Sequence, residues 1–359
     1  MRAAICYEFG KPLVVEEIEI DSPQAGEVLV KTTACAICHS DIHRIRGDWG
    51  GSTPIVVGHE GAGIVSQVGA GVTNVQPGNH VVVSLLRSCG RCFYCTIGRP
   101  YNCEGKFPLD GTGRLRNKEG VTLIHGLHTA GFAETLLVDQ SQVVKVPDDM
   151  PLDRACLLAC GVVTGLGAVV NTVQVETGSS VVVIGTGGVG LNSVQGAVLS
   201  GAARILAVDM LDNKLEAARR FGATHTINAK NEDAVAAVLA TTEGRGAEYA
   251  FVTVGSSRAI SQASRMIRQG GTVVVVGMPS NQDAEFALNA HDLTYGRTVT
   301  GSPMGSTRLS VDVPRLVELY RQGRLKLDEL ITDRYPLDRI NEAIESTERG
   351  EALRNVIVF

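Results

Sequence analysis

The hydrophobic and polar positions follow two different patterns in two parts of the chain. Up to about residue 160, short stretches rich in β-branched residues are bounded by turn residues, as in VLVKTTA (28–34) and GIVSQVG (63–69). QPGNHVVV (76–83) places a Pro-Gly turn directly before another such stretch. This pattern is typical of β-strands. The first part therefore predicts a small β-rich, barrel-like domain with inserted loops.

The pattern changes near residue 161, where apolar runs begin to alternate with helical segments. Strands that alternate with helices predict a parallel, doubly wound sheet. The expected elements are strand, glycine turn, helix and strand over 179–210, a helix over 213–223 ending at Gly222, a strand over 247–255, a helix over 258–271 with a glycine stop, and a strand over 272–279.

Two segments stand apart from these patterns. The segment from Cys89 to Ala130 has little periodicity and many Gly, Arg, Asn and Asp residues. We interpret it as a lobe held together by something other than a hydrophobic core. The C-terminal NVIVF (355–359) predicts a strand that returns to the first domain.

Composition limits the classes of function. The 359 residues are 44% hydrophobic and 20% charged with a net charge of −5, which is typical of a two-domain globular protein. The absence of a basic cluster argues against nucleic acid as the main partner. No apolar run reaches the ~18–20 residues of a membrane span. The N-terminal residues lack the pattern of a signal peptide, so we expect a cytoplasmic protein without a membrane partner.

The cysteines carry the strongest chemical signal. In a chain expected in the cytoplasm, nine cysteines favour metal ligands or core residues over disulfides. Four thiols within fifteen residues can surround one tetrahedral ion, and a closed set of four thiolates suits structural zinc. Such a metal would supply folding free energy that the irregular lobe lacks. An iron–sulfur cluster and four unrelated buried thiols are the alternatives. The four residues are Cys89, Cys92, Cys95 and Cys103.

A glycine-rich turn indicates a dinucleotide. GTGGVG follows the apolar run VVVI and opens a predicted helix, and Asp209 ends the next predicted strand. This context turns a weak motif into a dinucleotide fingerprint whose pyrophosphate lies at the helix N-terminus. Asp209, with Lys214 nearby, would bond the adenosine ribose and repel a 2′-phosphate, which favours NAD over NADP. The expected cofactor-binding residues of the turn are Gly185, Gly187, Gly188, Val189 and Gly190.

A second metal site is suggested by residues far apart in the sequence. CAICHSDIH (35–43) holds Cys38, VVGHEGAG (56–63) holds the pair His59–Glu60, and LLACGVVTG (157–165) holds Cys160. Catalytic zinc sites keep three protein ligands and one open position. Cys38, His59 and Cys160 could supply these three ligands.

Together these residues resemble the zinc-dependent medium-chain alcohol dehydrogenases. The resemblance covers the whole chain and rests on the C-H-S-D-x-H stretch, the G-H-E segment, the four-cysteine lobe, Cys160 and the glycine turn. It implies a GroES-like catalytic domain (1–161 and 303–359) with a structural-zinc lobe (89–130). A Rossmann NAD-binding domain (162–302) would interrupt this catalytic domain.

The resemblance also implies residue roles. Cys38, His59 and Cys160 would bind the catalytic zinc, and Glu60 would approach the ion or replace its water. Asp41 would accept the ring N–H of His59 and fix its tautomer. The further implied contacts are Ser40 to the substrate oxygen, His43 at the far end of a proton relay, and His39, Thr164 and Arg354 to the cofactor. Cys6, Cys35 and Cys156 are expected in the core, and His125 and His128 are expected in the lobe without a ligand role.

The implied reaction is oxidation of an alcohol by hydride transfer to NAD, with zinc acting as a Lewis acid. A proton would leave through Ser40, a cofactor ribose hydroxyl and then His43, because histidine titrates near neutral pH. The small side chain of Ser40, with Trp49 and Leu85 lining an apolar pocket, favours bulky primary, aryl or allylic alcohols.

Two alternatives to this activity remain at this stage. One is a polyol or S-(hydroxymethyl)glutathione dehydrogenase of the same fold. The loop GDWGGST (47–53) carries a single acid, which counts against the glutathione branch. The other is a binding protein that keeps the fold without turnover. The long lobe resembles that of dimeric family members, so we expect a homodimer formed near TVTGS (298–302), with a homotetramer as the alternative.

Overall fold

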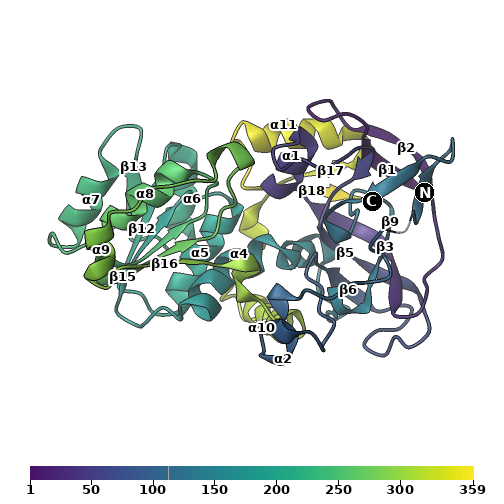
Figure 1. Cartoon of the computed structure of the whole chain (residues 1–359), viewed down its shortest axis with the longest axis horizontal. Coiled ribbons are helices and arrows are strands. Elements are labelled where there is room, and N and C mark those ends of the chain that lie inside the picture. Colours follow the sequence, from purple (N-terminus) through teal and green to yellow (C-terminus); the bar gives the residue numbers. More distant parts are fainter. Residues whose placement is uncertain (112) are drawn as a thin grey trace. The chain divides into compact units, whose positions relative to one another are not determined.

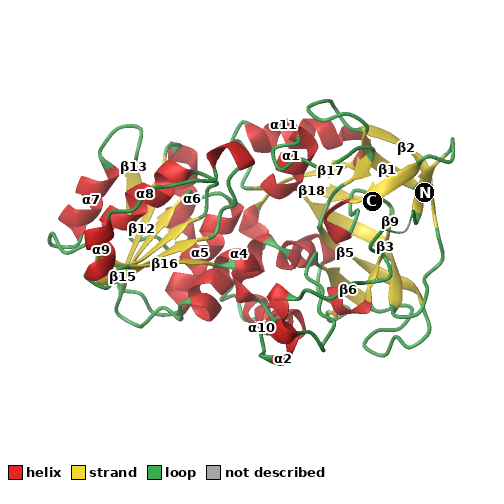
Figure 2. Cartoon of the chain, in the orientation of Figure 1, coloured by secondary structure: helices red, strands yellow, loops and turns green. Residues whose placement is uncertain are grey.

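The computed structural model describes residues 1–111 and 113–359. Contacts divide the chain into two compact units. The first contains Met1–Gly161 and Arg308–Phe359, and the second contains Val162–Thr307. Figure 1 colours both units in chain order and labels many of their elements, and Figure 2 shows their helices and strands.

The first unit is built from a closed barrel and a mixed sheet. The barrel runs in the order β1-β2-β7-β8-β4, and the seven-stranded sheet runs β10-β6-β5-β3-β18-β17 with β9 paired to β3. The barrel strands are β1 (Arg2–Cys6), β2 (Val14–Ile20), β4 (Ile55–Val56), β7 (Leu115–Asn117) and β8 (Thr122–His125). The sheet strands are β3 (Glu27–Ala36), β5 (Glu60–Val68), β6 (His80–Val83), β9 (Thr135–Asp139), β10 (Val143–Lys145), β17 (Ile331–Pro336) and β18 (Arg354–Val358).

The described part of the first unit also contains five α-helices and, next to one of them, a 3₁₀ turn. They are α1 (His39–Arg46), α2 (Phe93–Thr96), α3 (Leu152–Ala155), α10 (Leu309–Arg321) and α11 (Ile340–Glu348), with a 3₁₀ turn at Cys156–Ala159. The C-terminal strand β18 pairs antiparallel with β3, with Ile357 opposite Cys35. The prediction that NVIVF returns to the first domain is confirmed.

The prediction that 89–130 lacks a hydrophobic core is wrong for its second half. β7 and β8 pair with each other and complete the barrel. Leu115 and Leu123 lie opposite one another and are 1% and 2% exposed. Two short alternating strands therefore lie within the segment that composition marked as irregular, because three- and four-residue strands are too short to give a clear periodicity.

The second unit contains a six-stranded parallel sheet in the order β13-β12-β11-β14-β15-β16. Figure 2 shows helices on both sides of this sheet. This order is that of a doubly wound fold, in which the strand order reverses beside the first strand, β11. The strands are β11 (Ser180–Ile184), β12 (Arg204–Asp209), β13 (His225–Asn228), β14 (Ala247–Val252), β15 (Ile267–Val275) and β16 (Thr298–Gly301). The helices are α4 (Gly161–Gly167, beginning at the unit boundary), α5 (Gly188–Leu199), α6 (Asp212–Phe221), α7 (Ala234–Thr241), α8 (Ser257–Met266) and α9 (Ala290–Thr294).

Helix α6 ends as the sequence predicts, but α8 does not. Gly222 caps α6 in the left-handed region with φ of 112°, a conformation that glycine adopts without strain. The predicted helix over 258–271 instead ends at Met266, and β15 begins at Ile267. Ile267 pairs with Ala247, and the register then shifts before Thr272. The glycines that suggested a helix stop therefore lie in an irregular strand, where Gly270 has φ of 71°.

Among the described residues, the structure contains no single helix long and apolar enough to cross a membrane. One bent pair, Leu152–Ala159 with Gly161–Thr172, passes that test by length and composition.

Candidate active site

The stretch CAICHSDIH lies where strand β3 gives way to helix α1. Cys35 is near the end of β3, and Cys38 is the N-cap of α1. The Cys38 backbone N–H donates to Asp41 Oδ2 at 3.1 Å. This bond satisfies a donor at the helix start, as acidic residues in a first turn commonly do. The turn therefore fixes the position of the Cys38 side chain.

Asp41 also reaches the segment that carries His59. Its Oδ1 accepts the Gly58 N–H at 2.9 Å and a hydrogen bond from His59 Nδ1 at 2.8 Å. Asp41 and His59 are both 0% exposed. Because a carboxylate only accepts, Nδ1 carries a ring proton, and Nε2 is the ring nitrogen that remains available to a metal. Nε2 is buried without a hydrogen-bond partner.

Four side chains converge at this unpartnered nitrogen. Ligand atoms of Cys38, His59, Glu60 and Cys160 lie within 4.8 Å of one another, and all four residues are buried. Cys160 arrives from the bend that follows the 3₁₀ turn Cys156–Ala159. Two thiols, an imidazole lone pair and a carboxylate are ligands that zinc prefers. This cluster fits a zinc ion, which would also satisfy the unpartnered nitrogen.

The pKa values of the two thiols in this cluster are shifted in opposite directions. The hydrogen bond from Cys160, together with neighbouring His59, holds the pKa of the Cys38 thiol well below its usual range. The same hydrogen bond raises the pKa of the Cys160 thiol, and burial adds to the effect. One thiolate is therefore already favoured before a cation binds, which suits a metal ligand.

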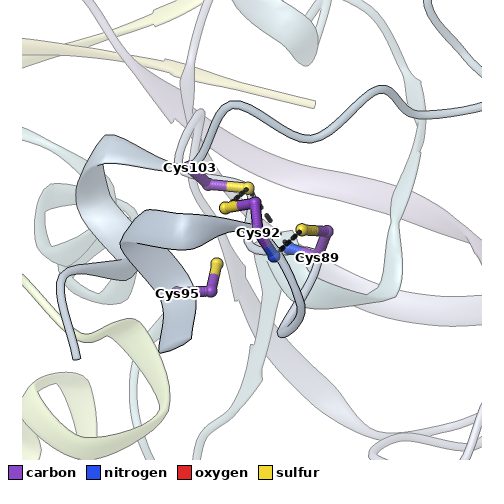
Figure 3. A group of neighbouring side chains, drawn as sticks. All are labelled: Cys89, Cys92, Cys95 and Cys103. Carbon is purple, nitrogen blue, oxygen red and sulfur yellow. Dashed lines mark hydrogen bonds between the residues drawn. The ribbon is translucent and has the colours of Figure 1, made fainter. Parts of the chain in front are cut away.

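A second cluster of ligands lies in the lobe. Cys89, Cys92, Cys95 and Cys103 bring their sulfurs within 4.8 Å of one another (Figure 3). Backbone N–H groups donate to these sulfurs, including Cys92 N to Cys89 at 3.3 Å and Gly105 N to Cys103 at 3.3 Å. A Cβ on Gly105 would lie 2.8 Å from the Cys89 sulfur.

The pKa values of the four thiols in this second cluster are shifted in two directions. Burial raises the pKa of the Cys95 thiol to about 12 and also raises that of the Cys103 thiol. Backbone N–H groups of Cys95 and Glu104 lower the pKa of the Cys92 thiol to about 6. Backbone N–H groups of Arg91 and Cys92 likewise lower the pKa of the Cys89 thiol. Four sulfurs with donors aimed at them form a closed set, which fits a structural zinc.

The glycine turn between β11 and α5 has the geometry that a dinucleotide needs. Gly185 has φ of 88°, and a Cβ on Gly190 would lie 1.8 Å from the Gly185 carbonyl oxygen. A Cβ on Gly187 would meet nothing within 4 Å. The first position therefore requires glycine for the turn, the last requires it for close packing, and space is open at the N-terminus of α5.

Comparisons with known proteins agree with these features. Residues 24–148 match the family model described as an alcohol dehydrogenase GroES-like domain, and residues 188–322 match the one described as a zinc-binding dehydrogenase. An NDMA-dependent alcohol dehydrogenase from Amycolatopsis methanolica is 42% identical over 365 residues, covering 99% of this chain and 98% of the relative. The chain belongs to the zinc-dependent medium-chain alcohol dehydrogenases.

Other relatives extend the comparison. An S-(hydroxymethyl)glutathione dehydrogenase from Paracoccus denitrificans is 38% identical, covering 100% of this chain and 99% of the relative. The crystal structure of benzyl alcohol dehydrogenase from Acinetobacter calcoaceticus superimposes with a TM-score of 0.92 at 34% identity, covering 100% and 99% of the two chains. The chain is therefore an alcohol dehydrogenase that uses zinc and a nicotinamide cofactor.

In this dehydrogenase, Glu60 and Arg354 form a buried ion pair. Glu60 opens β5, Arg354 opens β18, and their side chains are 0% and 6% exposed. Burial raises the pKa of the Glu60 carboxyl to about 7, against the opposing charge of Arg354. Glu60 therefore lies beside the other three residues of the cluster, and its carboxylate is paired with the guanidinium of Arg354. The pairing involves the arginine that the family resemblance assigns to the cofactor.

The predicted relay residues lie around helix α1. Ser40 and His43 are in the helix, and Trp49 follows it. The His43 ring stacks on Trp49 with 5.1 Å between ring centroids. His43 Nδ1 hydrogen-bonds Asp48 Oδ2 at 2.6 Å. Sequence reasoning missed Asp48, although its position one residue before the predicted pocket residue Trp49 was a usable signal.

The predicted ribose contact, Asp209, has a further set of partners. Its Oδ2 accepts the backbone N–H of Thr186 at 2.7 Å and the Thr186 hydroxyl at 3.0 Å. Its Oδ1 accepts the backbone N–H groups of Met210 and Leu211. Asp209 therefore also holds the glycine turn against the end of β12. Lys214 is 6% exposed, and burial lowers the pKa of its ammonium group.

The remaining predicted residues lie in the core, in helices, or at and after strand ends. Cys6, Cys35 and Cys156 are each 0% exposed in the core. Leu85 follows β6 and is half-buried, His39 is the first residue of α1, and Thr164 lies in α4 at 8% exposure. His125 and His128 lie at the end of β8 and in the turn after it, outside both metal clusters.

Proposed function

We propose that this dehydrogenase oxidises a bulky primary, aryl or allylic alcohol to an aldehyde or ketone, with NAD as the hydride acceptor. The observation that carries the proposal is the buried convergence of Cys38, His59 and Cys160 around an unpartnered imidazole nitrogen. If Cys38, His59 and Cys160 are the ligands and the Glu60 carboxylate stays paired with Arg354, one position is left for a substrate oxygen, as in catalytic zinc sites.

The residues of the first unit orient the reaction and move the proton. Bound zinc would supply Lewis acidity at the alcohol oxygen, and bound NAD would accept the hydride. Asp41 keeps Nε2 of His59 free for the metal, and the Ser40 hydroxyl would accept the proton of the alcohol as it releases its own proton towards His43. His43, held by Asp48 and stacked on Trp49, passes that proton towards solvent.

The cofactor-binding residues proposed for the second unit are those of the glycine turn with Asp209, Lys214 and Thr164. The open space at Gly187 supports pyrophosphate binding at the start of α5. Asp209 supports NAD over NADP, because a carboxylate at the end of β12 repels a 2′-phosphate. His39 and Arg354 remain proposed cofactor contacts. Arg354 would contact the cofactor while it remains paired with Glu60.

The preference for a bulky alcohol rests on the pocket residues Ser40, Trp49 and Leu85. Serine has no methyl group beside its hydroxyl, which leaves room near the metal for a larger carbon group. Trp49 offers an aromatic wall, and its stacking on His43 fixes the position of that wall. The similarity to a benzyl alcohol dehydrogenase supports an aryl substrate.

A second candidate is oxidation of the glutathione–formaldehyde adduct, favoured by the 38% identity to an S-(hydroxymethyl)glutathione dehydrogenase. A polyol substrate is the remaining alternative. The test is kcat/KM for benzyl alcohol, ethanol, sorbitol and the glutathione adduct with NAD. We expect benzyl alcohol to have the largest value. A larger value for the glutathione adduct or for sorbitol would overturn the proposal.

We also propose the domain roles, assembly and location. Residues 1–161 and 303–359 would form the catalytic domain and residues 162–302 the coenzyme domain, whereas the contacts carry the second unit on to Thr307. β16 is the last strand in its sheet order, and such an edge offers unpaired backbone groups to a second copy. We therefore favour a homodimer through β16 over a homotetramer, in the cytoplasm. Sedimentation at several protein concentrations tests the assembly.

A further inference from the structure

The carboxylate of Asp209 accepts four hydrogen bonds from its own chain. Its Oδ2 accepts the Thr186 backbone N–H at 2.7 Å and the Thr186 hydroxyl at 3.0 Å. Its Oδ1 accepts the backbone N–H groups of Met210 at 2.7 Å and Leu211 at 3.1 Å. An ionised carboxylate offers about four lone-pair sites, and these four donors occupy them. A ribose that bonds Asp209 must therefore displace one of the donors or share its site.

Three of these donors are backbone groups that the fold holds in place. The Thr186 N–H belongs to the glycine turn, in which Gly185 has φ of 88°. The N–H groups of Met210 and Leu211 lie at the start of α6, where Leu211 is the N-cap. The Thr186 hydroxyl differs from them, because it rotates about its own side-chain bonds while the backbone stays in place. It is therefore the donor that a ligand displaces most easily.

Thr186 and Asp209 lie at the carboxyl ends of neighbouring parallel strands. β11 and β12 run in register, with Ile184 opposite Val208. Ligands of doubly wound folds bind outside these strand ends. Thr186 is 0% exposed, whereas Asp209 is partly exposed. The hydroxyl therefore reaches the carboxylate from within the protein, and the exposed part of the carboxylate is left for a ligand.

We propose that the Thr186 hydroxyl competes with the adenosine ribose of NAD for Asp209 Oδ2 and thereby weakens NAD binding. The inference rests on the proposed ribose contact of Asp209. When the ribose donates to Oδ2, the Thr186 hydroxyl gives up its bond, while the Thr186 backbone N–H keeps the carboxylate in place. Thr186 acts through Asp209, so it is a specificity-determining residue and not a catalytic one.

The competition also bears on the choice between NAD and NADP. A 2′-phosphate replaces the donating 2′-hydroxyl and brings negative charge towards the Asp209 carboxylate. Removal of the Thr186 hydroxyl leaves that charge in place and frees an acceptor that NAD uses better than NADP. Loss of the hydroxyl should therefore increase the preference for NAD.

The test measures NAD binding to the full-length, zinc-loaded protein by isothermal titration calorimetry. Thr186→Val replaces the hydroxyl with a methyl group of similar size and keeps the backbone N–H. We expect the dissociation constant for NAD to fall by about 2–10-fold, the range that one net hydrogen bond gives. The melting temperature without cofactor should fall, because the bond to Asp209 is lost. An unchanged dissociation constant overturns the inference, and a higher one assigns the hydroxyl to orienting the carboxylate instead.

Three further variants show whether the hydroxyl itself is responsible. Thr186→Ser keeps a hydroxyl and should bind NAD like the wild type, whereas Thr186→Ala should bind it more tightly, as Thr186→Val does. The Thr253 hydroxyl donates to the carbonyl oxygens of Ile184 at 3.1 Å and Gly185 at 2.6 Å. Thr253→Val therefore loosens the same turn without freeing Asp209. Tighter NAD binding in Thr186→Ser or in Thr253→Val would contradict the inference.

Two nucleotides show whether the ribose is the competitor. Thr186→Val should bind ADP more tightly than the wild type does, but it should bind 2′,3′-dideoxy-ADP equally well, because that nucleotide has no ribose hydroxyl to donate. An equal gain for both nucleotides overturns the assignment.

Asp209→Gly separates this inference from the proposed function. If that variant leaves the relative affinities for NAD and NADP unchanged, the proposed ribose contact fails. If it changes them while Thr186→Val binds NAD as the wild type does, only the present inference fails.

Discussion

The carboxylate of Asp41 accepts a hydrogen bond from the ring N–H of His59 at 2.8 Å, with both side chains fully buried. The same carboxylate accepts the backbone N–H groups of Cys38 and Gly58. One residue on the first turn of α1 therefore sets the position of one proposed zinc ligand and the tautomer of another. This arrangement joins two ligands that lie 21 residues apart in the sequence.

Asp41→Asn should weaken zinc binding at this site. The amide has one oxygen instead of two, and it lacks the charge that makes Nε2 a stronger ligand. Changes of this kind cost about 10–100-fold in metal affinity. Chelator competition measures the affinity, and NADH formation should fall with occupancy. Asp48→Asn is the control, because Asp48 contacts His43 and should leave zinc affinity unchanged; equal affinities in the two variants would contradict this role.

His43 and Asp48 should act together in proton transfer. His43→Gln should lower kcat by about 10²-fold, the lower end of the range for acid–base groups. Asp48→Asn should give a smaller loss in the same step, because the amide can still bond the imidazole but lacks the charge of the carboxylate that lies 2.6 Å from it. The pH profile of kcat distinguishes this role from a structural one. A melting temperature that drops with an unchanged pH profile would assign Asp48 to stability alone.

Asp209→Gly should shift the cofactor preference towards NADP. Loss of the carboxylate removes the repulsion of a 2′-phosphate, but it also removes the bonds to Thr186. We therefore expect a higher NADP/NAD ratio of kcat/KM together with a lower melting temperature. Thr186→Val separates the two effects, because it loses a bond to Asp209 and keeps the charge. An unchanged cofactor ratio in Asp209→Gly would refute the ribose contact.

Cys92→Ser should remove the structural zinc and destabilise the lobe. The closed set of four thiolates would lose one ligand, and metal binding is coupled to folding in such sites. Zinc content should fall from two ions per chain to one, with a lower melting temperature. Cys6→Ala, a core position outside both clusters, should keep both ions. Retention of two ions by Cys92→Ser would contradict the assignment.

Some of this architecture could be predicted because it depends on local spacing. The four lobe cysteines lie within fifteen residues, and the glycine turn lies between a predicted strand and a predicted helix. The proposed catalytic ligands required more, because Cys160 lies more than a hundred residues after Cys38. The residue types only suggested this set, and the family resemblance assigned it.

The features that the sequence did not reveal depend on tertiary contacts. The Glu60–Arg354 pair joins β5 to β18, and no spacing rule connects positions so far apart. Asp48 is a loop residue, and its partner His43 can be identified only from the folded arrangement of α1 and the turn after it. The irregularity of β15 at Gly270 was not predicted, because a glycine pair after a helical pattern is also the usual signal for the end of a helix.

The central claim is that Cys38, His59 and Cys160 hold the zinc at which the alcohol reacts. Its most direct test is zinc content and NADH formation in Cys38→Ala, with Cys35→Ala as the buried control from the same stretch. The account predicts one zinc per chain, an intact fold and a loss of turnover on the order of 10³-fold in Cys38→Ala, with Cys35→Ala unaffected. Normal zinc content and retained turnover in Cys38→Ala would contradict it.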